Sequence, residues 1–182
     1  MGMAVSVPRY TVDDLEHFPD DGNRHELLDG LLLVTPGPAA VHQNVASQLH
    51  GLLFDAVQRS GHARVVSPGA ISVPPRNHLQ PDILVYPARF GPSVNWKDVS
   101  EHWLAVEIFS QSSRIYDREF KRDAYFVFGV PQVWLVDIAD RSVEVWRSRS
   151  EHAVVRDVIR WRVPTLDLVV PIELAALFAG LD

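Results

Sequence analysis

The stretch that decides the fold is residues 103–137, WLAVEIFSQSSRIYDREFKRDAYFVFGVPQVWLVD. Two apolar runs, residues 103–109 and 133–138, flank a polar loop and a segment with helical spacing. Strand, helix and strand in this order predict a right-handed crossover between parallel strands. One carboxylate, Glu107, interrupts the first apolar run, and a buried acid costs several kcal/mol unless it is paired, protonated or metal-bound. We therefore expect Glu107 to be a metal ligand.

The middle of this stretch predicts a helix over residues 118–128, with Asp117 as its N-cap. Asp117, Lys121 and Tyr125 are spaced by four residues and so form a stripe on one helix face. An adjacent apolar stripe packs on the sheet. The polar stripe can either pair with itself in solvent or bring Lys121 toward the acid of the first strand.

Two elements upstream also carry polar residues of interest. An Asp-Gly pair between apolar runs predicts a β-hairpin over residues 24–35, with Glu26 in its first arm. Glu26 is either an exposed edge-strand acid or a further acid of the site. Apolar residues at helical spacing predict a helix over residues 40–59, with His42 and Gln43 in its first turn. These two are either ordinary surface residues or phosphate contacts.

Asp82 follows a proline, which favours an extended conformation, and so stands at the start of a buried strand over residues 83–86. Asp137, at the end of the second apolar run, precedes a turn and is expected to be structural. The remaining expectations are a loop over residues 74–78, antiparallel strands over residues 153–160 and 166–169, and a C-terminal helix opened by Pro171.

Length and composition predict one domain of 182 residues with a central mixed sheet flanked by helices, an α/β (α+β) fold. We expect residues 1–9 to be a flexible tail and residues 10–182 to form the domain. No cysteine is present, which excludes thiolate catalysis and disulfides. No run is long enough to span a membrane and no secretory signal is visible, so a cytoplasmic location is expected. The net charge of −6 argues against a nucleic-acid coat protein but not against a nuclease.

Asp82 and Glu107 would place two carboxylates on separate core strands. If the strands are neighbours, both acids ionise together only with a cation between them. Oxygen ligands without cysteine favour Mg²⁺ or Mn²⁺. Such an ion lowers the pKa of a bound water, and a nearby lysine such as Lys121 can orient that water or stabilise charge on a phosphoryl group.

At these residues the chain resembles the Uma-type family of restriction endonucleases, within the PD-(D/E)XK nuclease superfamily. The matching motifs are Glu26 to Gly30, Thr35-Pro36, His42, Pro81-Asp82, Glu107 to Ser110, Asp117, Lys121, Tyr125, Gly129 to Pro131 and Trp134 to Asp137, which together span most of the chain.

The resemblance implies a restriction-endonuclease-like core and a Mg²⁺-dependent DNA endonuclease that hydrolyses phosphodiester bonds. Asp82 and Glu107 match the family's two acids, and Glu26 matches a supporting upstream acid. The superfamily's usual lysine position, two residues after the second acid, is here Phe109. In the Uma-type pattern a lysine of the following helix replaces it, and Lys121 matches that lysine.

The site expected from both lines of reasoning has three parts. Its catalytic residues are Asp82, Glu107 and Lys121. Its metal ligands are Asp82, Glu107 and the backbone carbonyl of Ile108, supported by Glu26. Its substrate contacts are His42, Gln43, Arg114, Arg118 and Tyr125.

Two other functions fit the same residues: a non-catalytic nucleic-acid or protein-binding module, and a metal-dependent hydrolase of another phosphodiester. We expect a homodimer, since cutting both strands of a duplex usually needs two sites. The expected interface is an exposed strand pair over residues 143–159, with Trp146 and Trp161.

Overall fold

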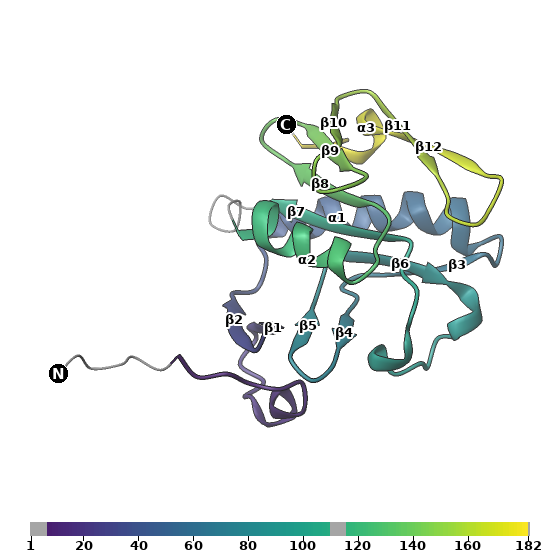
Figure 1. Cartoon of the computed structure of the whole chain (residues 1–182). Coiled ribbons are helices and arrows are strands. Elements are labelled where there is room, and N and C mark those ends of the chain that lie inside the picture. Colours follow the sequence, from purple (N-terminus) through teal and green to yellow (C-terminus); the bar gives the residue numbers. More distant parts are fainter. Residues whose placement is uncertain (1–6, 110–115, 182) are drawn as a thin grey trace.

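The computed structural model describes residues 7–109 and 116–181, and of residues 116–118 the backbone alone. A six-stranded mixed sheet forms its centre (Figure 1). In spatial order its strands are β10 (His152–Val155), β9 (Ser142–Trp146), β8 (Val133–Asp137), β7 (Leu104–Phe109), β6 (Ile83–Pro87) and β3 (Ala63–Val66). The expected central mixed sheet with few helices is confirmed.

β7 and β8 are the parallel pair of this sheet, and the other neighbouring strands run antiparallel. Glu107 pairs with Leu135 across the parallel ladder, and Ile83 pairs with Val106 across the antiparallel one. The strands that carry Asp82 and Glu107 are therefore neighbours. This adjacency brings the two acids within reach of each other.

The crossover between β7 and β8 ends in a wide π-helical turn (Tyr116–Lys121) that continues as α2 (Arg122–Val127). The helix expected over residues 118–128 is thus present, but it is split between two backbone geometries. Helix α1 (Ala40–Leu53) likewise continues into a π-helical segment (Phe54–Gln58). The two together match the helix expected over residues 40–59. π-Helical turns are frequent at functional sites.

α1 and α2 cover opposite faces of the six-stranded sheet (Figure 1). Because side chains alternate along β7, Val106 and Ile108 join the core on the α1 side. Ala105 and Phe109 join the core on the α2 side, which is therefore also the side of Glu107.

A second sheet of four strands lies beside the first and carries the N-terminal hairpin (Figure 1). Its order is β2 (Leu31–Thr35), β1 (Arg24–Leu28), β5 (Asn77–Leu79) and β4 (Ile71–Val73). The expectation of a loop over residues 74–78 is wrong at its end, because Asn77 and His78 pair with Val73 and Ser72. Short 3-10 helices in the described residues are Asp13–His17, Ala88–Phe90 and Trp96–Asp98.

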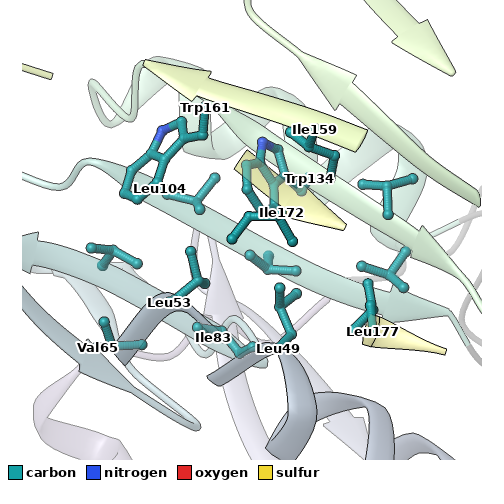
Figure 2. Close-up of a cluster of buried hydrophobic side chains, with 14 of the residues drawn as sticks. Leu49, Leu53, Val65, Ile83, Leu104, Trp134, Ile159, Trp161, Ile172 and Leu177 are labelled. Atoms are coloured by element: carbon teal, nitrogen blue, oxygen red, sulfur yellow. The ribbon is translucent and has the colours of Figure 1, made fainter. Parts of the chain in front are cut away.

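The C-terminal region packs on the α1 side of the six-stranded sheet. β11 (Val158–Arg162) and β12 (Val169–Glu173) form a two-stranded antiparallel sheet, and α3 (Leu174–Leu177) follows. Figure 2 shows Trp161 beside Trp134 of β8, with Leu49 and Leu53 of α1 below them. The rings of Trp134 and Trp161 meet edge to face, 6.0 Å apart.

Several expectations for this region are wrong. The strand expected over residues 153–160 is divided into β10 and β11, and of the strand expected over residues 166–169 only Val169 belongs to a strand, β12. Pro171 lies inside β12, opposite Arg160, and not in a helix, which begins only at Leu174. A proline is tolerated there because β12 has one neighbour and needs no second row of N–H donors.

The expectation that Trp146 and Trp161 lie on an exposed surface is also wrong. Their side chains are 7% and 0% exposed and belong to the core. Trp161 points inward because alternate residues of β11 face the core on the α1 side of the sheet. Trp146 of β9 lies in the core on the α2 side, where its ring stacks on His152 and contacts the guanidinium of Arg122. No helix in the described parts of the chain is long and apolar enough to cross a membrane.

Candidate active site

Asp82 lies directly before β6 and is almost completely buried, with 3% of its surface exposed. Its Oδ2 accepts a hydrogen bond from the backbone N–H of Ile108 at 2.8 Å and lies 3.0 Å from Nε2 of His42. Its Oδ1 lies 2.7 Å from the guanidinium of Arg24. The carboxylate is thus held against β7, α1 and β1 at once.

A tight turn after β3 fixes the backbone at Asp82. The hydroxyl of Ser67 donates to the carbonyl of Asp82 at 2.8 Å, and the N–H of Gly69 donates to the carbonyl of Pro81 at 3.2 Å. A Cβ on Gly69 would lie 2.4 Å from the Cβ of Leu84, so only glycine lets the two backbones come this close.

The partners of Asp82 keep it ionised. Burial alone would raise the pKa of Asp82, but hydrogen bonds from His42 and Ile108 and the charge of Arg24 outweigh it and lower that pKa. Burial likewise opposes the charge of Arg24, yet the carboxylates of Asp82, Glu107 and Glu26 leave the pKa of Arg24 raised. The lowered pKa of Asp82 and the raised pKa of Arg24 both indicate that the two side chains form a charged pair.

Glu107 lies in the middle of β7 and is 2% exposed. The hydroxyl of Tyr125 donates a hydrogen bond to its Oε1, and Nζ of Lys121 lies 3.6 Å from the same oxygen. Lys121 and Tyr125 are both buried, although they come from the segment around the start of α2. Lys121 and Tyr125 of the stripe spaced by four therefore turn inward toward the acid, while the side chain of Asp117 lies outside the described residues.

Glu26 of β1 is fully buried and is the closer partner of Lys121. Its Oε2 lies 2.7 Å from Nζ of Lys121, and its Oε1 accepts from the N–H of Gln80 at 2.6 Å. Oε2 of Glu26 and Oδ1 of Asp82 receive no well-directed hydrogen bond, but each touches a cation, and we regard the ion pairs as their compensation. Glu26 thus links the hairpin sheet to α2 through Lys121.

The donor set fits a hard divalent cation. Three carboxylates (Glu26, Asp82, Glu107) face two permanent cations (Arg24, Lys121), an excess of one negative charge, 3 − 2, before His42 is counted. Within the described residues, no three acidic or histidine side chains converge on one point as a complete ligand cage. Mg²⁺ commonly takes only one or two carboxylates and keeps waters or phosphate oxygens for the rest.

A cavity of about 270 Å³ has Arg24 in its lining. Its lining includes His25, His78 and Gln80. Burial, partly offset by the charge of Glu26, lowers the pKa of His78, so this wall carries a neutral imidazole near neutral pH.

Of the substrate contacts expected at the site, Gln43 has no described contact with the acid cluster. Gln43 is exposed on α1, one residue beyond His42. Arg114 and the side chain of Arg118 lie outside the described residues. For Ile108 the described contact is its N–H on Asp82, whereas the expectation concerned its carbonyl.

Arg24 is the site residue that sequence reasoning missed. A signal was present, because Arg24 and Glu26 are two residues apart in one strand and so share a face. Placing Glu26 at the site would have placed Arg24 there too.

Comparisons with known proteins show the family and the fold of this chain. A family model described as "Putative restriction endonuclease" matches residues 12–177. The crystal structure of a putative nuclease of the DUF820 group from Anabaena variabilis superposes with a TM-score of 0.72 at 19% identity, over 92% of this chain and 97% of that one. No curated protein matches. The likeness to the crystal structure supports the nuclease-like fold, and the family match over nearly the whole length shows that this chain belongs to the Uma2 family of putative restriction endonucleases.

Proposed function

We propose that this chain is a Mg²⁺-dependent endonuclease that hydrolyses phosphodiester bonds of DNA, with Asp82, Glu107 and Lys121 as its catalytic residues. The observation that carries the proposal is the position of Lys121. Its ammonium lies 3.6 Å from Glu107 and enters from the segment before α2, while Phe109 packs in the core. A lysine is thus supplied where the strand itself offers none.

Burial supports a chemical purpose for this cluster. Taking several ions out of water costs more than most ion pairs return, and similarly shaped apolar residues are often as stable. Here three acids, a lysine and an arginine lie together with little exposed surface. Perturbed, buried ionisable groups of this kind cluster at functional sites.

Asp82 and Glu107 would hold the metal, which when bound supplies a nucleophilic water and stabilises charge on the phosphoryl oxygens. Lys121, beside Glu107, would orient the attacking water or neutralise negative charge on the phosphoryl group. Tyr125 fixes the carboxylate of Glu107 through its hydrogen bond. Glu26 anchors Lys121, and the same carboxylate can complete the ligand set as a supporting acid.

Plasmid nicking with Mg²⁺ or Mn²⁺ tests the proposal. Asp82→Asn, Glu107→Gln and Lys121→Met should each lower the cleavage rate by about 10²-fold or more, as expected when a group that stabilises transition-state charge is removed. The chain offers a matched control, because Lys97 is its other lysine and is exposed. Lys97→Met should cleave like the wild type.

Equal cleavage by the wild type and by folded Asp82→Asn would refute the proposal. Cleavage of RNA or a small phosphodiester in place of DNA would refute only the substrate. Folding of each variant is checked by circular dichroism and by its melting temperature, so that loss of cleavage is not confused with loss of structure.

A homodimer belongs to the same proposal, since two sites are needed to cut both strands of a duplex together. Light scattering coupled to size exclusion measures this directly. If the protein is a monomer that nicks one strand at a time, the proposed chemistry stands and the proposed homodimer is wrong.

A further inference from the structure

A second cavity, of about 720 Å³, lies apart from the candidate active site and is lined by three arginines. Arg160 and Arg162 belong to β11, and Arg147 directly follows β9. Alternation along β11 turns Ile159 and Trp161 into the core. The two β11 arginines therefore point outward, and both are exposed.

These three arginines have weaker or no carboxylate partners, whereas most other arginines in the described structure form an ion pair with a carboxylate. Carboxylates pair with Arg9, Arg24, Arg59, Arg89, Arg122 and Arg156. Among the described residues no carboxylate pairs with Arg147 or Arg160, and Arg162 reaches Asp167 only at 3.9 Å, with both side chains largely exposed. Around this cavity three positive charges face one negative charge, an excess of two, in a chain whose net charge is −6.

The backbone of the cavity wall is strained. Thr165, in the turn between β11 and β12, lines the cavity and has a φ of 61°. A β-branched residue is rarely found in this left-handed region, and such strain concentrates at functional sites. The turn is closed by the N–H of Val163, which donates to the carbonyl of Leu168 at 2.9 Å. The strained turn and the three arginines thus meet at one cavity.

We propose that this arginine-lined cavity binds phosphates of a nucleic-acid backbone, as a contact separate from the candidate active site. Guanidinium groups bind phosphate oxygens through two parallel N–H bonds, which makes arginine the preferred residue for this ligand. Alternate residues of a strand are about 6.7 Å apart, close to twice the axial rise of about 3.4 Å per nucleotide. Arg160 and Arg162 are therefore spaced to follow one strand, with Arg147 beside them.

The cavity lies at the end of the six-stranded sheet where β8 begins, because Gln132 lines it and immediately precedes β8. The strand β11 that walls it packs on the α1 side of the sheet, whereas the side chain of Glu107 lies on the α2 side, so the cavity is a contact distinct from the acid cluster. The inference rests on the proposed function, because it takes nucleic acid as the substrate.

Binding without catalysis tests this assignment. The full-length chain is titrated against a fluorescent DNA duplex in EDTA, and the affinity is measured by anisotropy at several salt concentrations between about 50 and 200 mM. Each arginine that neutralises a phosphate contributes about 0.9 to the slope of log affinity against log salt. The double variant Arg160→Gln/Arg162→Gln should lower that slope by about 1.8, and adding Arg147→Gln by about 0.9 more.

Arg59→Gln is the control, because Arg59 is exposed directly after the segment Phe54–Gln58, is absent from the cavity lining, and its loss changes the net charge by one unit, as each single cavity substitution does. Slopes of the double variant equal to that of Arg59→Gln would overturn the assignment, and so would a wild type that does not bind the duplex. Asp82→Asn should lose plasmid cleavage and keep the wild-type slope. If the wild type cleaves plasmid but the cavity substitutions leave the salt slope unchanged, the proposal for the cavity fails and the proposed nuclease activity stands. If the substitutions lower the salt slope but the wild type does not cleave, the proposed nuclease activity fails and the phosphate-binding cavity stands.

Discussion

Replacing Lys121 by methionine should destabilise the protein strongly in the absence of divalent ions. Lys121 is 4% exposed and is the nearest cation to Glu26, at 2.7 Å, with Glu107 at 3.6 Å. Removing one member of a buried ion pair leaves an uncompensated charge and costs about 3–5 kcal/mol. Small proteins are stable by only about 5–15 kcal/mol, so the loss would be a large share of the total.

A double-mutant cycle separates the ion pair from the shape of the side chain. Glu26→Gln removes the charge that Lys121 compensates, while the amide can still accept from Gln80. The double variant Glu26→Gln/Lys121→Met should therefore be more stable than Lys121→Met by about 2 kcal/mol or more, since removing both charges of a buried pair is far less costly than removing one. Urea unfolding in EDTA gives all four free energies, and Lys97→Met should stay within about 0.5 kcal/mol of the wild type.

If Lys121→Met lowers the free energy of unfolding by less than about 1 kcal/mol, the value typical of solvated surface pairs, Lys121 is not a buried partner of Glu26. The pairing is equally refuted if the two substitutions are additive, because residues that share an ion pair should couple.

Three further predictions concern stability. Burial, against a smaller opposing effect of Glu101, lowers the pKa of His102 to about 4, so the folded state keeps it neutral while the unfolded state takes up a proton near pH 6.5. The contribution of His102 to the free energy of unfolding is thus full above pH 6.5, and about 3 kcal/mol of it is lost as the pH falls to about 4. In His102→Leu the free energy of unfolding should fall by about 3 kcal/mol less than in the wild type over the same pH range. Gly69→Ala places a Cβ 2.4 Å from Leu84 and should cost about 1–3 kcal/mol in urea unfolding and slow plasmid cleavage, because the turn that holds Asp82 must shift. Trp161→Ala removes a fully buried ring and should cost about 3–5 kcal/mol, seen as a lower melting temperature; a change below about 1 kcal/mol would contradict its place in the core.

The elements of the fold that follow from local patterns were predictable. The two apolar runs and the helical spacing between them predict β7, α2 and β8, and the structure confirms their parallel pairing. Pro171 was misplaced because a proline before an acidic residue and leucine fits a helix start as well as an edge strand. Only the pairing with β11 decides between the two.

The candidate site was predictable where residues interrupt an apolar pattern. Glu107 stands out in its strand, and Lys121 follows from the spacing of four. Arg24 did not stand out, since an arginine near a hairpin is ordinary and its partner Asp82 lies far along the chain. Long-range pairing of this kind depends on how the hairpin sheet packs against β6, which periodicity does not encode.

The six-residue helix α2 has a consequence for how the site is assembled. A helix this short has no stability of its own in water, because the cost of nucleation is not recovered over so few residues. Lys121 and Tyr125 therefore hold this segment to the sheet by the same contacts that complete the acid cluster. Neutralising the acids should release α2 as a separate opening unit, visible as faster amide exchange in this helix while the strands beneath it stay protected.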